Sequence, residues 1–213
     1  LKGKAVLCVG CGSGEEIDYL HSLGAQKVVG IDISQKLIDI AKKSYPKLEF
    51  YVMDAEHLDF PKESFDFVYS SLTMHYLENW SLALKSIHTV LKSGCIFLFS
   101  MTHPFFSAMQ KTDDEKVKAR ILGYRENKTD NTPEVYGNYL DNHSVTVSIN
   151  KDLSVTNYHR PLSVIIKDIV NAGFEILDIV EPKALEGSKT ENPKFWETHQ
   201  KIPEFMIVEL RKK

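Results

Sequence analysis

A glycine-rich turn near the start of the chain is the first place where residue types indicate chemistry. It follows an apolar run and reads Gly10-Cys11-Gly12-Ser13-Gly14. Glycine is required where a strand turns sharply into a helix and where the backbone must approach a ligand closely. We therefore predict that all five residues of this turn contact a bound small molecule.

The spacing of the glycines restricts the class of that molecule. A dinucleotide-binding turn reads Gly-x-Gly-x-x-Gly, but its third glycine would fall on Glu15. Glu15 and Glu16 also place two negative charges where a pyrophosphate would bind at a helix start. The turn thus disfavours NAD and is compatible with a nucleoside that carries positive charge and no phosphate. In the structural alternative, the two acids stabilise the helix dipole.

Three further segments follow the next predicted strands at their carboxyl ends. Asp32 ends the second strand, where an acid accepts hydrogen bonds from ribose hydroxyls, although it is also placed to cap the helix that begins after Ser34. Asp54 ends the third strand and is equally suited to an adenine amino group or to a helix cap. Residues 70–76 follow the fourth strand and face the ligand crevice of an open α/β sheet.

The elements that must position these residues alternate regularly. Short apolar runs predict strands buried on both faces, at residues 5–9, 27–31, 48–52, 65–70 and 95–100. Helix-length amphipathic stretches lie between them, at residues 14–23, 34–45 and 79–91. Ser34 is the expected N-cap of the second helix, and Gly94 the glycine stop after the third. This order predicts an α/β fold with a doubly wound, mostly parallel sheet.

The alternation stops after Thr102. Residues 102–160 form a long insertion that is polar at first, with a charge run at 113–116, and then predicts a hairpin from 143–149 and 153–158. Regular structure returns as a helix at 161–172 and strands at 174–180 and 204–210. We expect a single domain over residues 1–213, whose insertion covers the substrate. A surface elaboration without a role in function is the alternative.

Composition limits the classes of function. The net charge of −3 and the pI of about 6.3 argue against a nucleic-acid partner. No apolar run approaches the length of a membrane span, and no secretory leader precedes the first strand, although a start at Leu1 is consistent with a processed or truncated chain. Three cysteines favour a reducing cytoplasm. The Cys8-x-x-Cys11 pair lies in a strand and a loop without further soft ligands, so we expect neither a redox motif nor a metal site.

Five ordered motifs together resemble a known family. They are Val6-Leu7-x-Val9-Gly10-Cys11-Gly12-Ser13-Gly14, Gly30-Ile31-Asp32-Ile33-Ser34, Asp54-Ala55, Phe65-Asp66-Phe67-Val68 and Leu91-Lys92-Ser93-Gly94. In this order they resemble the class I S-adenosylmethionine (SAM)-dependent methyltransferases, closely over about residues 4–101. The tail resembles the small-molecule branch through Tyr158-His159-Arg160-Pro161, Ala172-Gly173-Phe174 and Glu181-Pro182, and so does the segment from Phe99 to Phe105.

The resemblance implies a Rossmann-like, seven-stranded sheet with an antiparallel last strand, and SAM as the cofactor. The glycine turn would lie under the methionine part of SAM, with Asp32 and the neighbouring Ile33 at the ribose. Asp54 and Ala55 would border the adenine. The backbone of the adjacent pair Ser71-Leu72 would meet the methionine amino group.

The chain departs from the family at two points. Family members usually have an acid where Cys8 stands, and that acid helps to hold the amino-acid end of SAM. Weaker SAM binding, or compensation by Glu15 or Glu16, would follow. Family members also have a helix before the first strand that helps to cover SAM, so the pocket is expected to be more open or the segment to be missing from this sequence.

Methyl transfer needs positioning more than acid–base chemistry. The candidates for a general base are His75 and His103, which follow central strands, with packing roles as the alternative. Arg160 is a candidate for an anionic substrate or a surface ion pair. We expect an enzyme that methylates a small molecule, acts as a monomer or homodimer, and binds neither nucleic acid nor membrane. A SAM-binding module without activity is the alternative, and an NAD-dependent reductase is disfavoured by Glu15.

Overall fold

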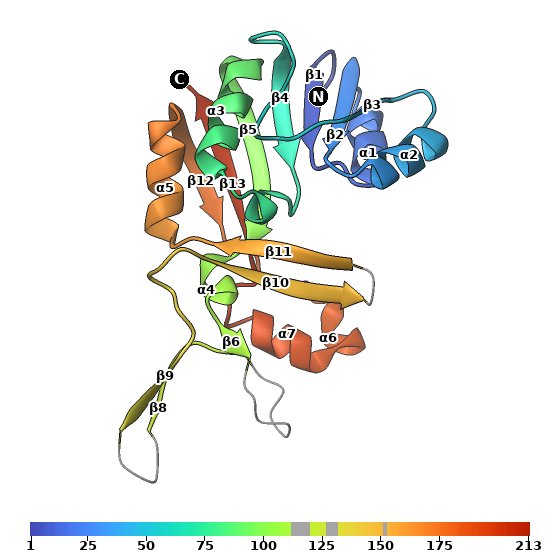
Figure 1. Cartoon of the computed structure of the whole chain (residues 1–213). Coiled ribbons are helices and arrows are strands. Elements are labelled where there is room, and N and C mark those ends of the chain that lie inside the picture. Colours follow the sequence, from blue (N-terminus) through green and yellow to red (C-terminus); the bar gives the residue numbers. More distant parts are fainter. Residues whose placement is uncertain (112–119, 127–131, 151–152) are drawn as a thin grey trace. The chain divides into compact units, whose positions relative to one another are not determined.

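A computed structural model describes residues 1–111, 120–126, 132–150 and 153–213 (Figure 1). The chain forms two compact units. Unit 1 contains residues 1–101, 166–180 and 207–213, and unit 2 contains residues 102–165 and 181–206. Unit 2 begins where the predicted insertion begins, but it also includes a late segment that the sequence pattern did not assign to it. The single-domain interpretation stays a prediction.

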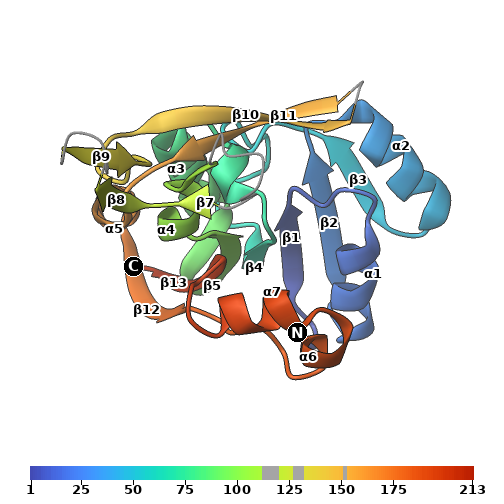
Figure 2. The same ribbon diagram turned by 90° about the horizontal axis from the view of Figure 1, so that it is seen from below.

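Unit 1 is built on a seven-stranded sheet, whose order is β12-β13-β5-β4-β1-β2-β3 (Figures 1 and 2). In chain order the strands are β1 (Ala5–Val9), β2 (Lys27–Asp32), β3 (Glu49–Val52), β4 (Phe65–Ser70), β5 (Leu91–Thr102), β12 (Phe174–Val180) and β13 (Phe205–Lys212). β1 to β5 pair in parallel, whereas β12 and β13 pair antiparallel. The predicted doubly wound, Rossmann-like sheet with an antiparallel last strand is therefore confirmed.

Helices connect the parallel strands, as the alternation predicted. They are α1 (Glu15–Ser22), α2 (Gln35–Ser44) and α3 (Trp80–Val90), with a short 3-10 helix η1 (Met74–Tyr76) before α3 and α5 (Leu162–Asn171) before β12. Ser34 caps α2 by accepting a hydrogen bond from the Leu37 amide at 3.4 Å, which confirms the predicted N-cap. Asn79 caps α3 in the same way through the Leu82 amide.

The two faces of the sheet carry separate cores because side chains alternate along each strand. On one face, Val6 and Cys8 of β1 belong to a buried cluster with Ile17 and Leu20 of α1 and with α2. On the other face, Phe99 of β5 packs edge-on against Trp80 of α3 at 5.7 Å between ring centroids, and Phe97 packs against Phe174 of β12. The carboxyl ends of the five parallel strands share one edge of this sheet, and the predicted ligand residues follow those ends.

Unit 2 consists of short elements. They are α4 (Pro104–Ser107), β6 (Gln110–Lys111), β7 (Arg120–Ile121), β8 (Gly123–Glu126), β9 (Pro133–Tyr136), β10 (His143–Asn150), β11 (Leu153–His159), α6 (Ser188–Glu191) and α7 (Pro193–His199). β10 and β11 form the predicted antiparallel hairpin, with a cross-strand hydrogen bond between the Thr146 and Thr156 hydroxyls at 2.9 Å. The charge run at 113–116 and the hairpin turn at 151–152 lie outside the described residues.

One local prediction was wrong, and some short strands were not predicted. Gly94 does not stop the third helix, because α3 ends at Val90 and Leu91 already pairs with Phe65 in the sheet. Gly94, with φ +74°, lies instead in the irregular start of β5, where the register with β4 shifts. The polar stretch after Thr102 also contains four short strands that were not predicted, because their two to four residues are too few to show a period.

Candidate functional site

The glycine turn between β1 and α1 has the backbone that its composition predicts. Gly10, Gly12 and Gly14 have φ angles of +74°, +54° and +92°, in the left-handed region that other residues rarely adopt. The Gly10 and Cys11 amides both donate to the Ile31 carbonyl, at 2.8 and 2.9 Å. The turn is thereby fixed to the end of β2.

The three glycines differ in what surrounds them. A Cβ on Gly10 would overlap the Thr73 side chain, whose hydroxyl donates to the Ser71 carbonyl at 3.0 Å. A Cβ on Gly14 would press against Phe50 at 3.0 Å, whereas a Cβ on Gly12 would meet no atom within 4 Å. Gly10 and Gly14 therefore serve close packing, and Gly12 leaves its exposed side open to a ligand.

Asp32 joins the turn to the end of β2. Its Oδ2 accepts a hydrogen bond from the Gly12 amide at 3.0 Å, and its Oδ1 accepts one from the Ser34 amide at 2.9 Å. A carboxylate has about four acceptor positions, so two remain for a ligand. The ribose and capping interpretations are thus compatible, because the carboxylate holds both amides and is still partly exposed to a ligand. Ile33 is 74% exposed, which leaves an aliphatic surface beside the carboxylate.

Asp54 and Ala55 follow β3. Asp54 Oδ1 accepts from the Glu56 amide at 2.9 Å in a turn and caps no helix, so the helix-cap interpretation was wrong; the His57 ring lies 3.8 Å from its Oδ2. Ala55 is buried. These contacts leave acceptor positions on the half-buried Asp54 carboxylate, and its adenine role stays a prediction.

Residues after β4 form a second backbone surface. Leu72 has φ +47°, which is uncommon for a residue with a side chain, and its amide donates to the Ser100 carbonyl and hydroxyl, both at 3.1 Å. Such strained positions concentrate at functional sites. Ser70, just before, is buried and donates its hydroxyl to the Val9 carbonyl at 3.0 Å. A side-chain hydrogen bond therefore joins the ends of β4 and β1, in addition to the backbone pairing of the two strands.

The two cysteines near the turn are buried, free thiols. Cys8 is fully buried, and burial raises its pKa, with a further rise from Cys11 and from the carboxylates of Glu16 and Asp32. Burial and the Asp32 carboxylate raise the pKa of Cys11 to about 12. Both side chains are neutral near pH 7, so Cys8 does not supply the negative charge that the family usually has at this position.

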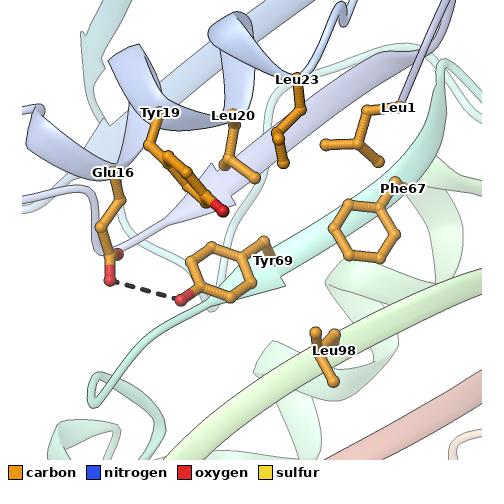
Figure 3. A pocket seen from close by; sticks show the side chains of 8 residues that line it. All are labelled: Leu1, Glu16, Tyr19, Leu20, Leu23, Phe67, Tyr69 and Leu98. Carbon is orange, nitrogen blue, oxygen red and sulfur yellow. Dashed lines mark hydrogen bonds between the residues drawn. The ribbon is translucent and has the colours of Figure 1, made fainter.

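A mostly apolar cavity of about 470 Å³ lies between α1, β4 and β5 (Figure 3). Its lining side chains are Leu1, Glu16, Tyr19, Leu20, Leu23, Phe67, Tyr69 and Leu98. Glu16 and Tyr69 stand together at one end of the group, joined by a hydrogen bond from the Tyr69 hydroxyl to Glu16 Oε1 at 3.3 Å. This end is the polar part of the cavity.

The two predicted histidine bases are both buried. Burial lowers the pKa of His75, in η1, to about 4, so its ring is neutral and weakly basic. His103, in unit 2, caps α4: its Nδ1 accepts from the Phe105 amide at 3.0 Å and its Nε2 lies 2.8 Å from Glu181 Oε1. Burial lowers the pKa of His103, and Glu181 offsets part of that effect. In this arrangement neither ring nitrogen of His103 is free to accept a proton.

A second buried histidine of unit 2 was not among the candidates. His159 Nδ1 lies 2.7 Å from the Ser107 hydroxyl, and its Nε2 lies 2.9 Å from the Tyr139 carbonyl. The carbonyl can only accept, so Nε2 carries the proton and Ser107 donates to Nδ1. Burial lowers the pKa of His159. Its neighbour Arg160 is buried too and bonds the Tyr158 carbonyl at 3.3 Å, which is not the surface position that an exposed ion pair needs.

The residues that support the turn and the Leu72 backbone from a distance were not predicted. Thr73 follows β4 and Ser100 lies in β5, so their contacts depend on which strands are neighbours in the sheet. Tyr69 reaches Glu16 across 53 positions, and Glu181 reaches His103 across 78. No spacing in a single sequence identifies such pairs.

The residues around the turn fit SAM in their chemistry. Gly12 offers an open backbone surface, Asp32 retains acceptor positions for ribose hydroxyls, and Ile33 exposes an aliphatic face. Carboxylates rather than cations surround the turn, which suits a sulfonium ligand. Within the described ranges, no group of three or more His, Cys, Asp and Glu side chains is arranged to hold a metal ion. The helices of the described chain are all too short or too polar to cross a membrane.

Comparison with known proteins agrees with this geometry. A family model described as a methyltransferase domain matches residues 7–99. A SAM-dependent methyltransferase from Mesorhizobium loti superimposes with a TM-score of 0.79 at 26% identity, over 99% of this chain and 92% of that one. A putative one from Listeria monocytogenes gives 0.80 at 26% identity, over 100% and 91%.

A relative with a named activity matches over part of its length. The demethylmenaquinone methyltransferase of Chlorobaculum parvum is 31% identical over 107 residues, which are 50% of this chain and 44% of that protein. This chain thus matches less than half of that protein.

Proposed function

Because the chain belongs to the class I SAM-dependent methyltransferases, we propose that it transfers the methyl group of SAM to a small molecule. The observation that carries this proposal is the double role of Asp32, which holds the Gly12 amide at 3.0 Å while retaining free acceptor positions beside an open backbone surface. The same carboxylate thereby orders the turn and is available to a ribose.

The chain's own residues bind and orient. When bound, SAM supplies a methyl carbon that the adjacent sulfonium activates for in-line displacement. The backbone of the Gly10–Gly14 turn and of Leu72 would border its methionine part, and Asp32, Asp54 and Ala55 would border its nucleoside. Leu72 has its strained φ held by Ser100, so this backbone is preorganised before any ligand binds.

Strong general-base catalysis is not part of this proposal. His75 has a pKa of about 4, and the ring nitrogens of His103 are both engaged. Roles for His75 and His103 beside the acceptor stay predictions. An acceptor that needs little help in losing a proton, such as a neutral amine or an acidic hydroxyl or carbon acid, suits such residues.

We further propose that residues 102–160 determine which acceptor binds. This segment leaves the sheet at the end of β5, the edge at which ligands of open α/β sheets bind. Phe105 is an exposed aromatic at its start. We expect Phe105→Ala to leave SAM affinity unchanged and to raise the KM for the acceptor; an unchanged KM would contradict the role.

The proposal is tested in two steps. Calorimetric titration with S-adenosylhomocysteine tests binding, and the absence of binding at millimolar ligand would contradict the proposed function. Turnover of methyl-labelled SAM with a pool of small metabolites then tests transfer. Binding without transfer to any pool component would favour the SAM-binding module instead.

A cytoplasmic location and a monomer or homodimer complete the proposal. All three cysteines are free, and two of them are buried, as suits a reducing compartment. Light scattering of the purified chain would decide between monomer and dimer.

A further inference from the structure

The amino-acid end of SAM carries an ammonium group, and the resemblance to the methyltransferase family implies that this group binds near position 8, close to the end of β1. Cys8, the residue just before the end of this strand, is a fully buried neutral thiol. A neutral thiol is a weak acceptor and cannot balance a cation. The following inference rests on the proposed function, since it concerns the same cofactor.

Glu16 places a carboxylate on the face of the sheet to which Cys8 points. Cys8 is the register partner of Tyr69 in the parallel pair β1–β4, so the two side chains project from the same face. The Tyr69 hydroxyl donates to Glu16 Oε1 at 3.3 Å. Figure 3 shows Glu16 reaching from α1 toward this hydroxyl, at the polar end of the cavity.

The other nearby acids are less suited to the ammonium group. Asp32 follows β2 and is assigned to the ribose in the proposed function, while Glu15 and Asp18 are exposed. Glu16 is half-buried, and no Lys, Arg or His of the described residues lies within ion-pair distance of it. A half-buried carboxylate that has one hydroxyl donor and no cation is suited to accept a charged ligand group.

We propose that Glu16 accepts the ammonium group of SAM and supplies from helix α1 the negative charge that position 8 lacks. Tyr69 is then a positioning residue, because its hydroxyl orients the carboxylate. Glu16 would also stabilise the start of α1, as any acid in the first turn does. The ammonium role differs from that general role in depending on one chemical group of the ligand.

The test compares ligands that differ in this group. Glu16→Gln retains the shape of the side chain and an oxygen that can accept from Tyr69. We expect it to weaken S-adenosylhomocysteine binding about tenfold in calorimetric titration, the usual scale for one charge-assisted hydrogen bond. Binding of 5′-methylthioadenosine, which lacks the amino-acid end, should not change. Decarboxylated SAM, which keeps the amine and lacks the carboxylate, should lose affinity as S-adenosylhomocysteine does.

Glu15→Gln is the matched control, since it removes an exposed acid from the same helical turn. It should leave all three affinities unchanged. Tyr69→Phe should weaken S-adenosylhomocysteine binding by a smaller factor, about threefold, because it frees the carboxylate without removing it. It also keeps the proposal testable if Glu16→Gln does not fold.

Cys8→Asp in the Glu16→Gln background should restore most of the lost affinity. Unchanged S-adenosylhomocysteine binding in Glu16→Gln, or an equal loss for 5′-methylthioadenosine, would overturn the assignment. If the unmodified chain bound none of these ligands, the proposed function would fail instead, so the two failures are distinguishable.

Discussion

Replacing Asp32 by alanine should affect folding and cofactor binding separately. The Asp32 carboxylate accepts from two backbone amides, those of Gly12 at 3.0 Å and Ser34 at 2.9 Å. A hydrogen bond to a charged group contributes about 1.5–3 kcal/mol, and partial exposure of Asp32 reduces this. We therefore expect the free energy of unfolding to fall by about 2–4 kcal/mol without any ligand.

The binding effect adds to the loss of stability. Loss of the ribose acceptor and release of the Gly12 amide should weaken S-adenosylhomocysteine binding by about one to two orders of magnitude, or about 1.4–2.8 kcal/mol. A ligand at about 100 times its Kd stabilises a fold by about 2.7 kcal/mol, and after a hundredfold loss the same concentration gives only about 0.4 kcal/mol. Urea unfolding with and without ligand measures both quantities on one sample.

Asp39→Ala is the control, because Asp39 is an exposed acid whose side chain accepts a hydrogen bond from the Gln35 amide group on the same helix. It should change neither quantity measurably. An Asp32→Ala variant as stable as the unmodified chain would refute the importance of the two amide bonds. A variant that is destabilised but binds with unchanged affinity would remove Asp32 from the cofactor site.

Three further predictions concern the turn and the buried groups around it. Gly10→Ala should lower the free energy of unfolding by roughly 3 kcal/mol or more, because the new Cβ adds backbone strain and overlaps Thr73. Gly12→Ala should lower it by only about 1 kcal/mol, because its Cβ meets open space. Equal losses in urea unfolding would contradict this difference. Cys8 and Cys11 should resist a thiol reagent at about pH 8 in the native protein, since burial raises both pKa values; rapid labelling of either would be the opposite result. Burial lowers the pKa of His75 to about 4, so the folded protein keeps this ring neutral while the unfolded chain protonates it below about pH 6.5. The free energy of unfolding should therefore fall by about 2 kcal/mol between about pH 7 and pH 5. A His75→Gln variant should show a flatter profile of unfolding free energy against pH, and an equally steep one would assign the loss to other groups.

The sheet of unit 1 follows closely from the sequence pattern. Continuous apolar runs at β1 and β2 require burial on both faces, and helix-length segments between successive strands favour parallel pairing. The short strands of unit 2 escaped prediction because two to four residues show no reliable period. The helix end at Val90 was misplaced because the glycine that resembled a stop belongs to an irregular strand start.

The candidate site divides in a similar way. Residues that act through their own backbone or through a local cap, such as Gly12 and Ser34, are recognisable because sequence spacing determines their geometry. The histidines were harder to judge. Their types indicated chemistry, but burial of His75 and the pairing of His103 with Glu181 depend on packing that one sequence does not express.

The sequence by itself determined the strand–turn–helix that carries the glycines and the acids that end β2 and β3, because those features follow from local conformation and hydrophobic period. Only the tertiary structure decided that Asp32 holds the turn, that Thr73 fills the space beside Gly10, and that Glu16 meets Tyr69. These contacts join the turn or helix α1 to residues that lie beside them only in the folded sheet. Strand order and register decide which partners meet, and both depend on the packing of the whole sheet.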